Sequence, residues 1–442
     1  MKYSLCMLLL FVSSLLPSDA QSFVKVNRNR TVTVSARFPK ADEVRLRGSL
    51  AVEIKRSNLI KRLNLVPRML QKEDKVSLEV QNGQWTFTSK ALPSDLYTYV
   101  LSVDDADTLD AANPNKVREV NTWYNWLIIP GGRGDDYLTR DNVAHGRVET
   151  VWYPSSIAGL PRRRMMVYLP PNYDGTRRYP VLYLLHGAGG DEKSWLELGR
   201  AAQIMDNLIA DKRCKEMIVV MPNGNADRAA TPGEDPYNKD TEAASAVPSM
   251  FGRIETAFIP DIVNYIDSHY ATLADRAHRA IAGLSMGGMH TLFIAANNPD
   301  TFDYVGLFSA KIVNEFMKEN RLRRIKRAGD QANTIGDLIP SITRKGPGKQ
   351  VSQLKQYADS GNVAIYDSLD AKLQRQFAAK PKLYYIAIGD TDFLLDENEA
   401  FLAKLDEKHY AYTYNPTDGG HEWMNWRRYL VDFLPRLFPD NP

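Results

Sequence analysis

Residues 279–297 read RAIAGLSMGGMHTLFIAAN, and this stretch decides the fold. An apolar run at 280–282 leads into GLSMG at 283–287, and residues 288–296 have the composition of a helix. A G-x-S-x-G sequence between a strand and a helix is typical of the nucleophile elbow, a sharp turn that raises its serine above the sheet. Its two glycines are needed because backbone packs on backbone at that turn. We therefore predict that Ser285 is a nucleophile.

The chain on either side of this turn alternates between strand-like and helix-like patterns. Strands are predicted at 165–169, 179–185, 217–221, 279–284, 304–308, 382–388 and 410–414, and helices at 254–270, 287–297, 398–408 and 423–438. Such alternation produces a mostly parallel sheet with helices on both faces. With the elbow, it predicts an α/β fold, an α/β-hydrolase domain over residues 145–442.

The earlier part of the chain has the pattern of a separate domain. Apolar and polar residues alternate with period two at 31–38, 43–47 and 75–80. Asn82-Gly83 is a strong signal for a hairpin turn. These features predict a small antiparallel β-sandwich over residues 21–130, followed by a linker over 131–144 that begins in a glycine-rich turn. Residues 53–68 fit either a long loop or a short helix.

A serine hydroxyl needs a base, and the downstream histidines supply the candidates. The chain has seven histidines, and only His409 and His421 follow Ser285 at a useful distance. His290 lies in the helix directly after the serine and should point elsewhere. His409 ends a polar helix, whereas His421 follows Asp-Gly-Gly in the loop between the last strand and the last helix. A base belongs in that loop, so His421 is predicted to be the base.

The acid that orients the base should follow an intermediate strand, and the loop after 382–388 contains three candidates. Asp390 and Asp392 compete, with Asp396 as a weaker third. Asp392 is favoured because it can turn back from the loop toward His421, whereas Asp390 suits a turn cap. Its role would be to hold the imidazole tautomer and to stabilise the imidazolium.

Two backbone N–H groups are expected to stabilise the oxyanion. One belongs to Met286, the residue directly after the nucleophile. The other should come from the glycine-rich loop after the strand at 179–185, from the N–H of Gly187 or Ala188. His186 is expected to shape this loop. The loop lacks the Gly-Lys-Thr/Ser spacing of a nucleotide-binding loop, which argues against a nucleotide.

Three aromatic residues lie close in sequence to these loops. Trp195, Phe393 and Trp423 are predicted to bind substrate by stacking on a sugar or a phenolic acid, although aromatic residues more often belong to the core. No metal and no organic cofactor are predicted. Cys214 is expected to be a structural thiol, since only two cysteines exist and Cys6 lies in the predicted leader.

The composition is that of a globular protein, and the first twenty residues differ from the rest. The net charge of +3 gives no reason to expect nucleic acid as a partner. Lys2, the apolar run at 5–16 and small residues at 18–20 predict a signal peptide over residues 1–20, and hence a periplasmic or extracellular protein. No later stretch is long and apolar enough for a membrane span. The oligomeric state is left open.

A basic insertion separates two βα units near residues 311–355. It has eleven Lys or Arg and four Asp or Glu, so its excess of seven positive charges is larger than that of the whole chain. It follows a strand on the side where such folds place their active sites. We predict either a lid over the site or a solvated excursion without a role.

Several stretches resemble a known family. The matching stretches are 148–153, 179–190, 220–225, 279–291, 389–395 and 418–426. They identify the second domain as similar to the esterase family that includes carbohydrate esterase family one. Residues 92–103 and 108–114 resemble the early-set sandwich related to carbohydrate-binding module family forty-eight. By position, the nucleophile, acid and base of the family fall on Ser285, Asp392 and His421.

The resemblance implies a secreted serine esterase that removes feruloyl or acetyl groups from xylan. Its expected partner is an acylated polysaccharide or oligosaccharide. Two alternatives share the fold: a siderophore esterase, and an acyltransferase. A carbohydrate-binding protein with little catalysis is a third alternative, against which the complete set of Ser285, His421 and Asp392 argues.

Overall fold

The computed structural model describes residues 22–59, 75–237, 252–312 and 362–439. By their internal contacts the chain divides into two compact units: residues 1–118 with 123–131, and residues 119–122 with 132–442. The predicted signal peptide and all of the basic insertion beyond Ile312 lie outside the described residues. No helix among the described residues is long and apolar enough to cross a bilayer.

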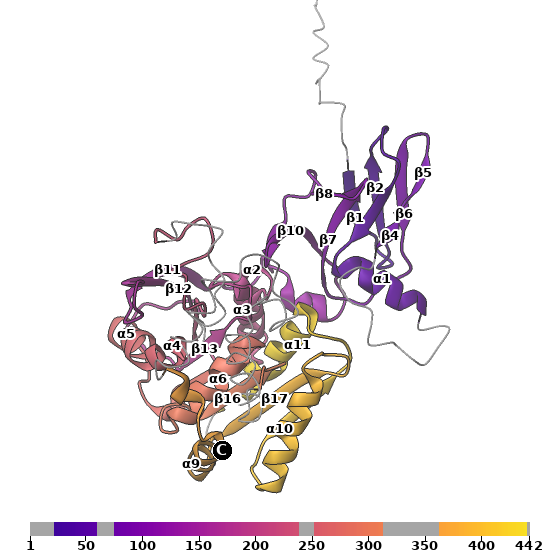
Figure 1. The fold of residues 1–442 in the computed structure, drawn as a ribbon. Coiled ribbons are helices and arrows are strands. Elements are labelled where there is room, and N and C mark those ends of the chain that lie inside the picture. The colour runs from indigo at the N-terminus through magenta and orange to yellow at the C-terminus, as the bar shows by residue number, and fades with distance from the viewer. Residues whose placement is uncertain (1–21, 60–74, 238–251, 313–361, 440–442) are drawn as a thin grey trace, which may run out of the picture. The chain divides into compact units, whose positions relative to one another are not determined.

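The first unit contains two antiparallel sheets (Figure 1). One has the order β1 (Ser22–Val26), β2 (Val32–Arg37), β6 (Gln84–Thr88) and β5 (Glu79–Gln81). The other has the order β4 (Val76–Ser77), β3 (Val44–Arg47), β7 (Leu96–Val103), β10 (Thr122–Ile128) and β9 (Lys116–Glu119), with β8 (Ala106–Thr108) beside β7. Three alternate residues of β2 are 0% exposed, as a strand with one face on a core requires: Val32, Val34 and Ala36.

In the first unit, the hairpin turn was predictable from sequence, but the sheet to which each strand belongs was not. Asn82 and Gly83 have φ of 52° and 73°, which confirms the predicted hairpin between β5 and β6. The single strand predicted at 75–80 is wrong, because β4 and β5 belong to different sheets and the N–H of Leu78 donates to the Val44 carbonyl (2.9 Å). Residues 53–68, for which the sequence fitted either a loop or a short helix, begin within a helix, α1 (Ser49–Leu59). The residues after Leu59 in this stretch are not described.

The second unit is built on one eight-stranded sheet, which confirms the predicted α/β class. Its order is β11 (Arg147–Pro154), β12 (Arg162–Leu169), β14 (Ile218–Pro222), β13 (Val181–Leu185), β15 (Arg279–Leu284), β16 (Tyr304–Phe308), β17 (Leu383–Gly389) and β18 (Thr413–Thr417). Pairs involving β11 and β12 are antiparallel, and every pair from β14 to β18 is parallel. The last strand starts three residues later than predicted.

Helices flank this sheet (Figure 1). They are α2 (Ser194–Glu197), α3 (Ala201–Ala210), α4 (Arg253–Ala257), α5 (Asn264–His269), α6 (Met286–Asn297), α9 (Leu369–Ala378), α10 (Leu395–Glu407) and α11 (Trp423–Phe433). Short 3₁₀ turns are η1 (Arg133–Tyr137), η4 (Arg276–His278), η6 (Asn362–Tyr366) and η7 (Leu434–Arg436). The single helix predicted at 254–270 is interrupted by a π-helical turn, η3 (Phe258–Val263), which contains Pro260; proline has no N–H to continue the α-helical ladder.

Both faces of the central strands are buried, which explains their unbroken apolar sequences. Ile281, Val305 and Ile386 share one core with residues of α6 and α10. On the opposite face, a Cβ at Gly306 would lie 3.0 Å from the Phe433 ring of α11. Phe308 packs against the same ring, with centroids 5.5 Å apart. Because helices cover both faces of the sheet, functional side chains can reach a substrate only at the edge formed by the carboxyl ends of its strands.

Candidate active site

Ser285 lies in a strained turn at the carboxyl end of β15. Its φ of 53° and ψ of −114° fall in a region that non-glycine residues rarely adopt. The Phe308 carbonyl of β16 accepts a bond from its N–H (3.0 Å). A Cβ on Gly287 would lie 2.5 Å from the His186 carbonyl oxygen, so only glycine fits there. The turn therefore has the shape that the sequence predicts for a nucleophile elbow.

His421 and Asp392 form a hydrogen-bonded pair. Nδ1 of His421 lies 2.9 Å and 3.0 Å from the two carboxylate oxygens of Asp392. The carboxylate is fully buried, and 14% of the imidazole side chain is exposed. An ionised carboxylate can only accept, so Nδ1 carries the hydrogen and Nε2 is left as an acceptor. This is the tautomer that a general base for a serine requires.

Asp390 has a different function from Asp392. Its Oδ1 accepts from the N–H of Gly419 (3.0 Å), and its own N–H donates to the Thr417 carbonyl (2.8 Å). Thr391 adds a bond from its N–H to the Gly419 carbonyl (3.1 Å). Asp390 therefore fastens the loop after β17 to the loop that carries His421, a longer-range contact than the local turn cap expected from sequence.

The other candidate residues lie outside this pair. Asp396 is in the first turn of α10, and His409 is exposed beyond the end of that helix. Asp418 forms an ion pair with Arg428 (3.0 Å). His290 is fully buried, and its Nδ1 lies 2.8 Å from Oε1 of Glu255.

The residues predicted as nucleophile, acid and base follow three parallel strands of one sheet. Ser285 follows β15, Asp392 follows β17 and His421 follows β18. The carboxyl ends of parallel strands meet at one edge, so the topology brings these residues to the same edge.

A chain of aromatic contacts joins His421 to Trp426 (5.0 Å between centroids), Trp426 to Trp423 (5.2 Å) and Trp423 to Trp195 (5.3 Å).

Backbone donors border Ser285 on two sides. Met286 is the first residue of α6, so its N–H is among those that have no acceptor within the helix. A Cβ on Gly187 would lie 3.2 Å from Cβ of Ser285, which shows how closely this loop approaches the serine. Gly187 itself is buried, and the next residue, Ala188, is exposed.

His186 is a neutral structural histidine in this loop. The N–H of Gly224 donates to its Nε2 (2.7 Å), so Nδ1 carries the hydrogen that bonds the Gly187 carbonyl (2.8 Å). Burial lowers its pKa to about 4, and the backbone bond to Gly187 offsets only part of this shift. It therefore connects two loops of the sheet edge, in agreement with its expected shaping role.

A buried ionic network, not anticipated from sequence, supports the same loop. Glu192 is 1% exposed and accepts from Nε of Arg164 (2.6 Å), which also pairs with Glu234. The other oxygen of Glu192 accepts from Asn223 (2.8 Å), and Asn225 donates to the Gly190 carbonyl (2.8 Å). The network fixes the end of the Gly187–Gly190 loop.

We expect Glu192→Ala to destabilise the fold by about 3 kcal/mol or more, because it leaves the buried Arg164 without its main partner. Glu216→Ala removes the partner of Arg177, whose side chain is 65% exposed. This control should cost less than about 1 kcal/mol. Urea unfolding measures both changes, and equal losses would contradict a supporting role for Glu192.

The three aromatic residues predicted to bind substrate occupy different environments. Trp195 is 1% exposed and donates from Nε1 to the Leu185 carbonyl (3.0 Å), so its prediction as a substrate contact is corrected: it is core beneath the loop. Trp423 is partly exposed. Phe393 is 66% exposed, and its ring centroid lies 4.4 Å from that of His421. Phe393 therefore offers a large apolar surface beside the candidate base.

The environment of Cys214 does not favour a reactive thiol. Burial raises the pKa of Cys214 to about 12, which keeps its thiol protonated and unreactive at neutral pH. In the described part of the chain no group of three His, Cys, Asp or Glu side chains is arranged to hold a metal ion.

Comparison with known proteins places the second unit in a family. The profile of the family described as "Putative esterase" matches residues 160–437. An endo-1,4-beta-xylanase/feruloyl esterase of Xylanibacter ruminicola is 36% identical over 236 residues, which are 52% of this chain and 30% of that protein. An acetyl esterase of Caldicellulosiruptor saccharolyticus is 24% identical, over 57% of this chain and 80% of that protein.

A solved structure resembles nearly the whole chain. The enterobactin esterase of Shigella flexneri aligns with 94% of this chain and 95% of its own, with a TM-score of 0.52 and 14% identity, a likeness of fold. The match to the xylanase/feruloyl esterase spans less than a third of that relative. The family profile covers well over half of the residues of the present chain, and the chain therefore belongs to the putative esterase family.

Proposed function

We propose that the chain is a serine carboxylic ester hydrolase with Ser285 as nucleophile, His421 as base and Asp392 as the acid that orients it. The observation that carries the proposal is the bond from His421 Nδ1 to the buried Asp392, at the sheet edge that also holds the strained Ser285. Each element suits nucleophilic acyl transfer, and Ser-acid-His is their order along the chain.

The reaction proceeds in two steps. Oγ of Ser285 attacks the ester carbonyl while Nε2 of His421 takes its proton, and the N–H groups of Met286 and of Gly187 or Ala188 stabilise the oxyanion. The C–O bond to the alcohol breaks and the imidazolium returns the proton to the leaving alkoxide, which forms the acyl-enzyme. Water then attacks the acyl-enzyme with the same proton transfers and releases the acid.

The proposed substrate is an acylated plant polysaccharide, with feruloyl or acetyl esters as the scissile groups. The named activities of the xylanase/feruloyl esterase and acetyl esterase relatives support this class. The exposed Phe393 beside His421 favours an aromatic acyl group. Export to the periplasm or the medium, through the leader expected at residues 1–20, is part of the proposal because such polymers do not enter cells.

An activity screen tests the proposal and separates it from its alternatives. Methyl ferulate, acetylated xylan and a catecholate siderophore ester are offered to the full-length protein, and the released acid is quantified. Turnover of the first or second substrate is expected. Preferential turnover of the siderophore would move the substrate to that class, and no turnover of any ester would refute the hydrolase.

Phe393→Ala is expected to raise KM for methyl ferulate by about three- to tenfold, because an aromatic contact contributes about 0.5–1.5 kcal/mol. KM for an acetyl ester, which has no ring, should change little. Phe23→Ala, at a 48% exposed phenylalanine of the first unit, is the matched control. Steady-state kinetics with both esters check this expectation; equal effects on both would exclude a role in recognising the aryl group.

A further inference from the structure

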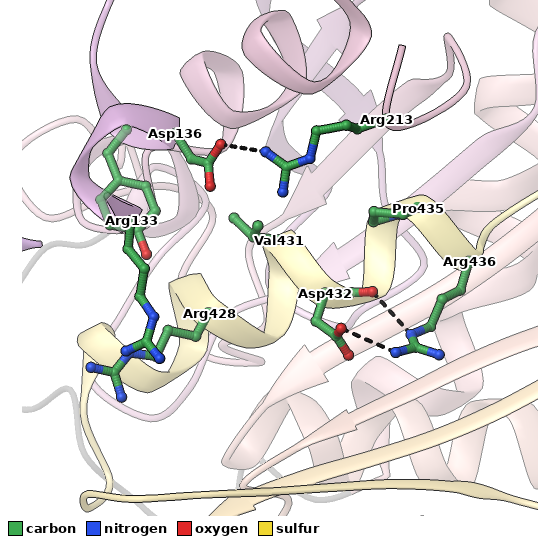
Figure 2. Close-up of a pocket in the computed structure, with 9 residues that line it drawn as sticks. Arg133, Asp136, Arg213, Arg428, Val431, Asp432, Pro435 and Arg436 are labelled. Atoms are coloured by element: carbon green, nitrogen blue, oxygen red, sulfur yellow. Dashed lines mark hydrogen bonds and ion pairs between the residues drawn. The ribbon is translucent and has the colours of Figure 1, made fainter. Parts of the chain in front are cut away.

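The second unit contains a pocket of about 280 Å³ that is not part of the active site. It is formed by α11, η7, η1 and the loop after α3 (Figure 2). Its charged lining residues are Arg133, Asp136, Arg213, Arg428, Asp432 and Arg436. Its volume is close to the lower limit for small-ligand sites, so it suits one sugar-sized group.

Arginine is in excess in this lining. Asp136 neutralises Arg213 (2.7 Å) and Asp432 neutralises Arg436 (3.1 Å). The other two arginines of the lining are Arg133 and Arg428. The lining thus has four arginines and two aspartates, and a third aspartate, Asp418, pairs with Arg428 from outside the pocket.

The two remaining arginines differ in their partners. Arg428 pairs outside the pocket with Asp418, whose side chain is 74% exposed, and its Nη1 also donates to Oδ1 of Asn425 (3.3 Å); an ion pair with so exposed a partner contributes little. Within the described part of the chain, Arg133 forms no ion pair, and it is exposed. Both side chains extend toward the same end of the pocket, and Arg436 lies near the other end (Figure 2). The end of the pocket near Arg133 and Arg428 therefore has donors suited to an anion.

The wall behind these arginines is rigid. The side chain of Arg428 is 12% exposed, and Tyr137 is 1% exposed. The guanidinium of Arg427 lies over the Tyr137 ring, 5.1 Å from its centroid. Burial lowers the pKa of the neighbouring Arg200 to about 10, and the positive charge of Arg427 contributes to this shift. The pocket thus has a fixed wall in a positive surrounding.

We propose that this pocket binds the carboxylate of a sugar acid carried by the polysaccharide substrate, with Arg133 and Arg428 as its partners. A guanidinium group pairs with a planar carboxylate through two parallel hydrogen bonds. The volume of the pocket is enough for the one sugar ring that carries this carboxylate. The inference rests on the proposed function for its polymer, and it adds a second, charged point of attachment away from the scissile ester.

The experiment measures binding without catalysis. The probe is an ester-free xylo-oligosaccharide with one glucuronic acid branch, compared by calorimetry with the same compound after reduction of its carboxyl group to an alcohol. The full-length protein should bind the acid at least about tenfold more tightly. Arg133→Gln should weaken binding of the acid about fivefold and leave binding of the reduced compound unchanged. Arg177→Gln, at an exposed arginine elsewhere in the unit, should change neither.

Three results would overturn the proposal: equal binding of the acid and its reduced form, no binding of either, or binding of inorganic phosphate through Arg133 without binding of the sugar acid. Because the probe has no ester, these outcomes do not depend on hydrolysis. Turnover of methyl ferulate by Arg133→Gln should equal that of the unaltered protein. The proposed hydrolase activity can therefore be refuted while carboxylate binding in the pocket is confirmed, and carboxylate binding can be refuted while the activity is confirmed.

Discussion

Ser285→Ala is expected to lower kcat for ester hydrolysis by about five orders of magnitude or more, to the residual rate that binding and oxyanion donors alone support. The change removes the only atom that forms the acyl-enzyme, and His421 then has no hydroxyl to deprotonate. Folding should persist, because alanine occupies the same φ of 53° with a smaller side chain. The measurement is single-turnover and steady-state kinetics with methyl ferulate.

Ser368→Ala is the matched control for this variant. Ser368 also has a φ of 53°, at the start of α9, although its ψ of 43° places it in the left-handed region, so its alanine variant tests the same substitution at another positive φ. It should retain full activity. If Ser285→Ala also retained full activity, another residue would have to be the nucleophile.

Asp392→Asn is expected to lower kcat by about 10⁴, with a small effect on KM. An asparagine amide facing Nδ1 favours the opposite imidazole tautomer, in which Nε2 carries the hydrogen and cannot take the serine proton. The variant also removes the negative charge that stabilises the imidazolium. A pH series of kcat on the purified variant measures both effects.

Asp390→Asn, two residues earlier in the same loop, is the control. Its Oδ1 accepts a single bond, from the N–H of Gly419, and an asparagine Oδ1 can accept the same bond. We expect less than a tenfold loss of kcat. The reverse pattern, with a large loss at Asp390 and a small one at Asp392, would exchange the two assignments.

The predictions that succeeded from sequence depend on short-range rules. The elbow at 283–287 was predictable because its G-x-S-x-G pattern lies within one short segment, although in the folded protein only Gly283 is required by contacts within the turn, and Gly287 is required by the backbone of His186. The Asn82-Gly83 hairpin follows from the left-handed conformation that both residues adopt. The mostly parallel sheet follows from the alternation of strands and helices. In each case the pattern on which the prediction depends lies within a short segment of the chain.

The predictions that failed depend on contacts between distant residues. The strand predicted at 75–80 divides because Leu78 bonds to Val44, more than thirty residues earlier. Trp195 is core because Leu185, Phe308 and Trp423 surround it. The network around Glu192 has no signal in sequence, since its members lie in strand β12 and in separate loops.

By itself, the sequence determined the class of fold, the serine on its turn and the histidine in the last loop, because periodicity and turn chemistry are properties of short segments. Tertiary structure alone showed that Asp392 contacts His421 whereas Asp390 fastens two loops, since both aspartates follow the same strand and only the folded loop orients them. It alone assembled the arginine pocket, whose residues are up to about 300 positions apart. Side chains from remote segments converge only when the core closes, and no local pattern encodes that convergence.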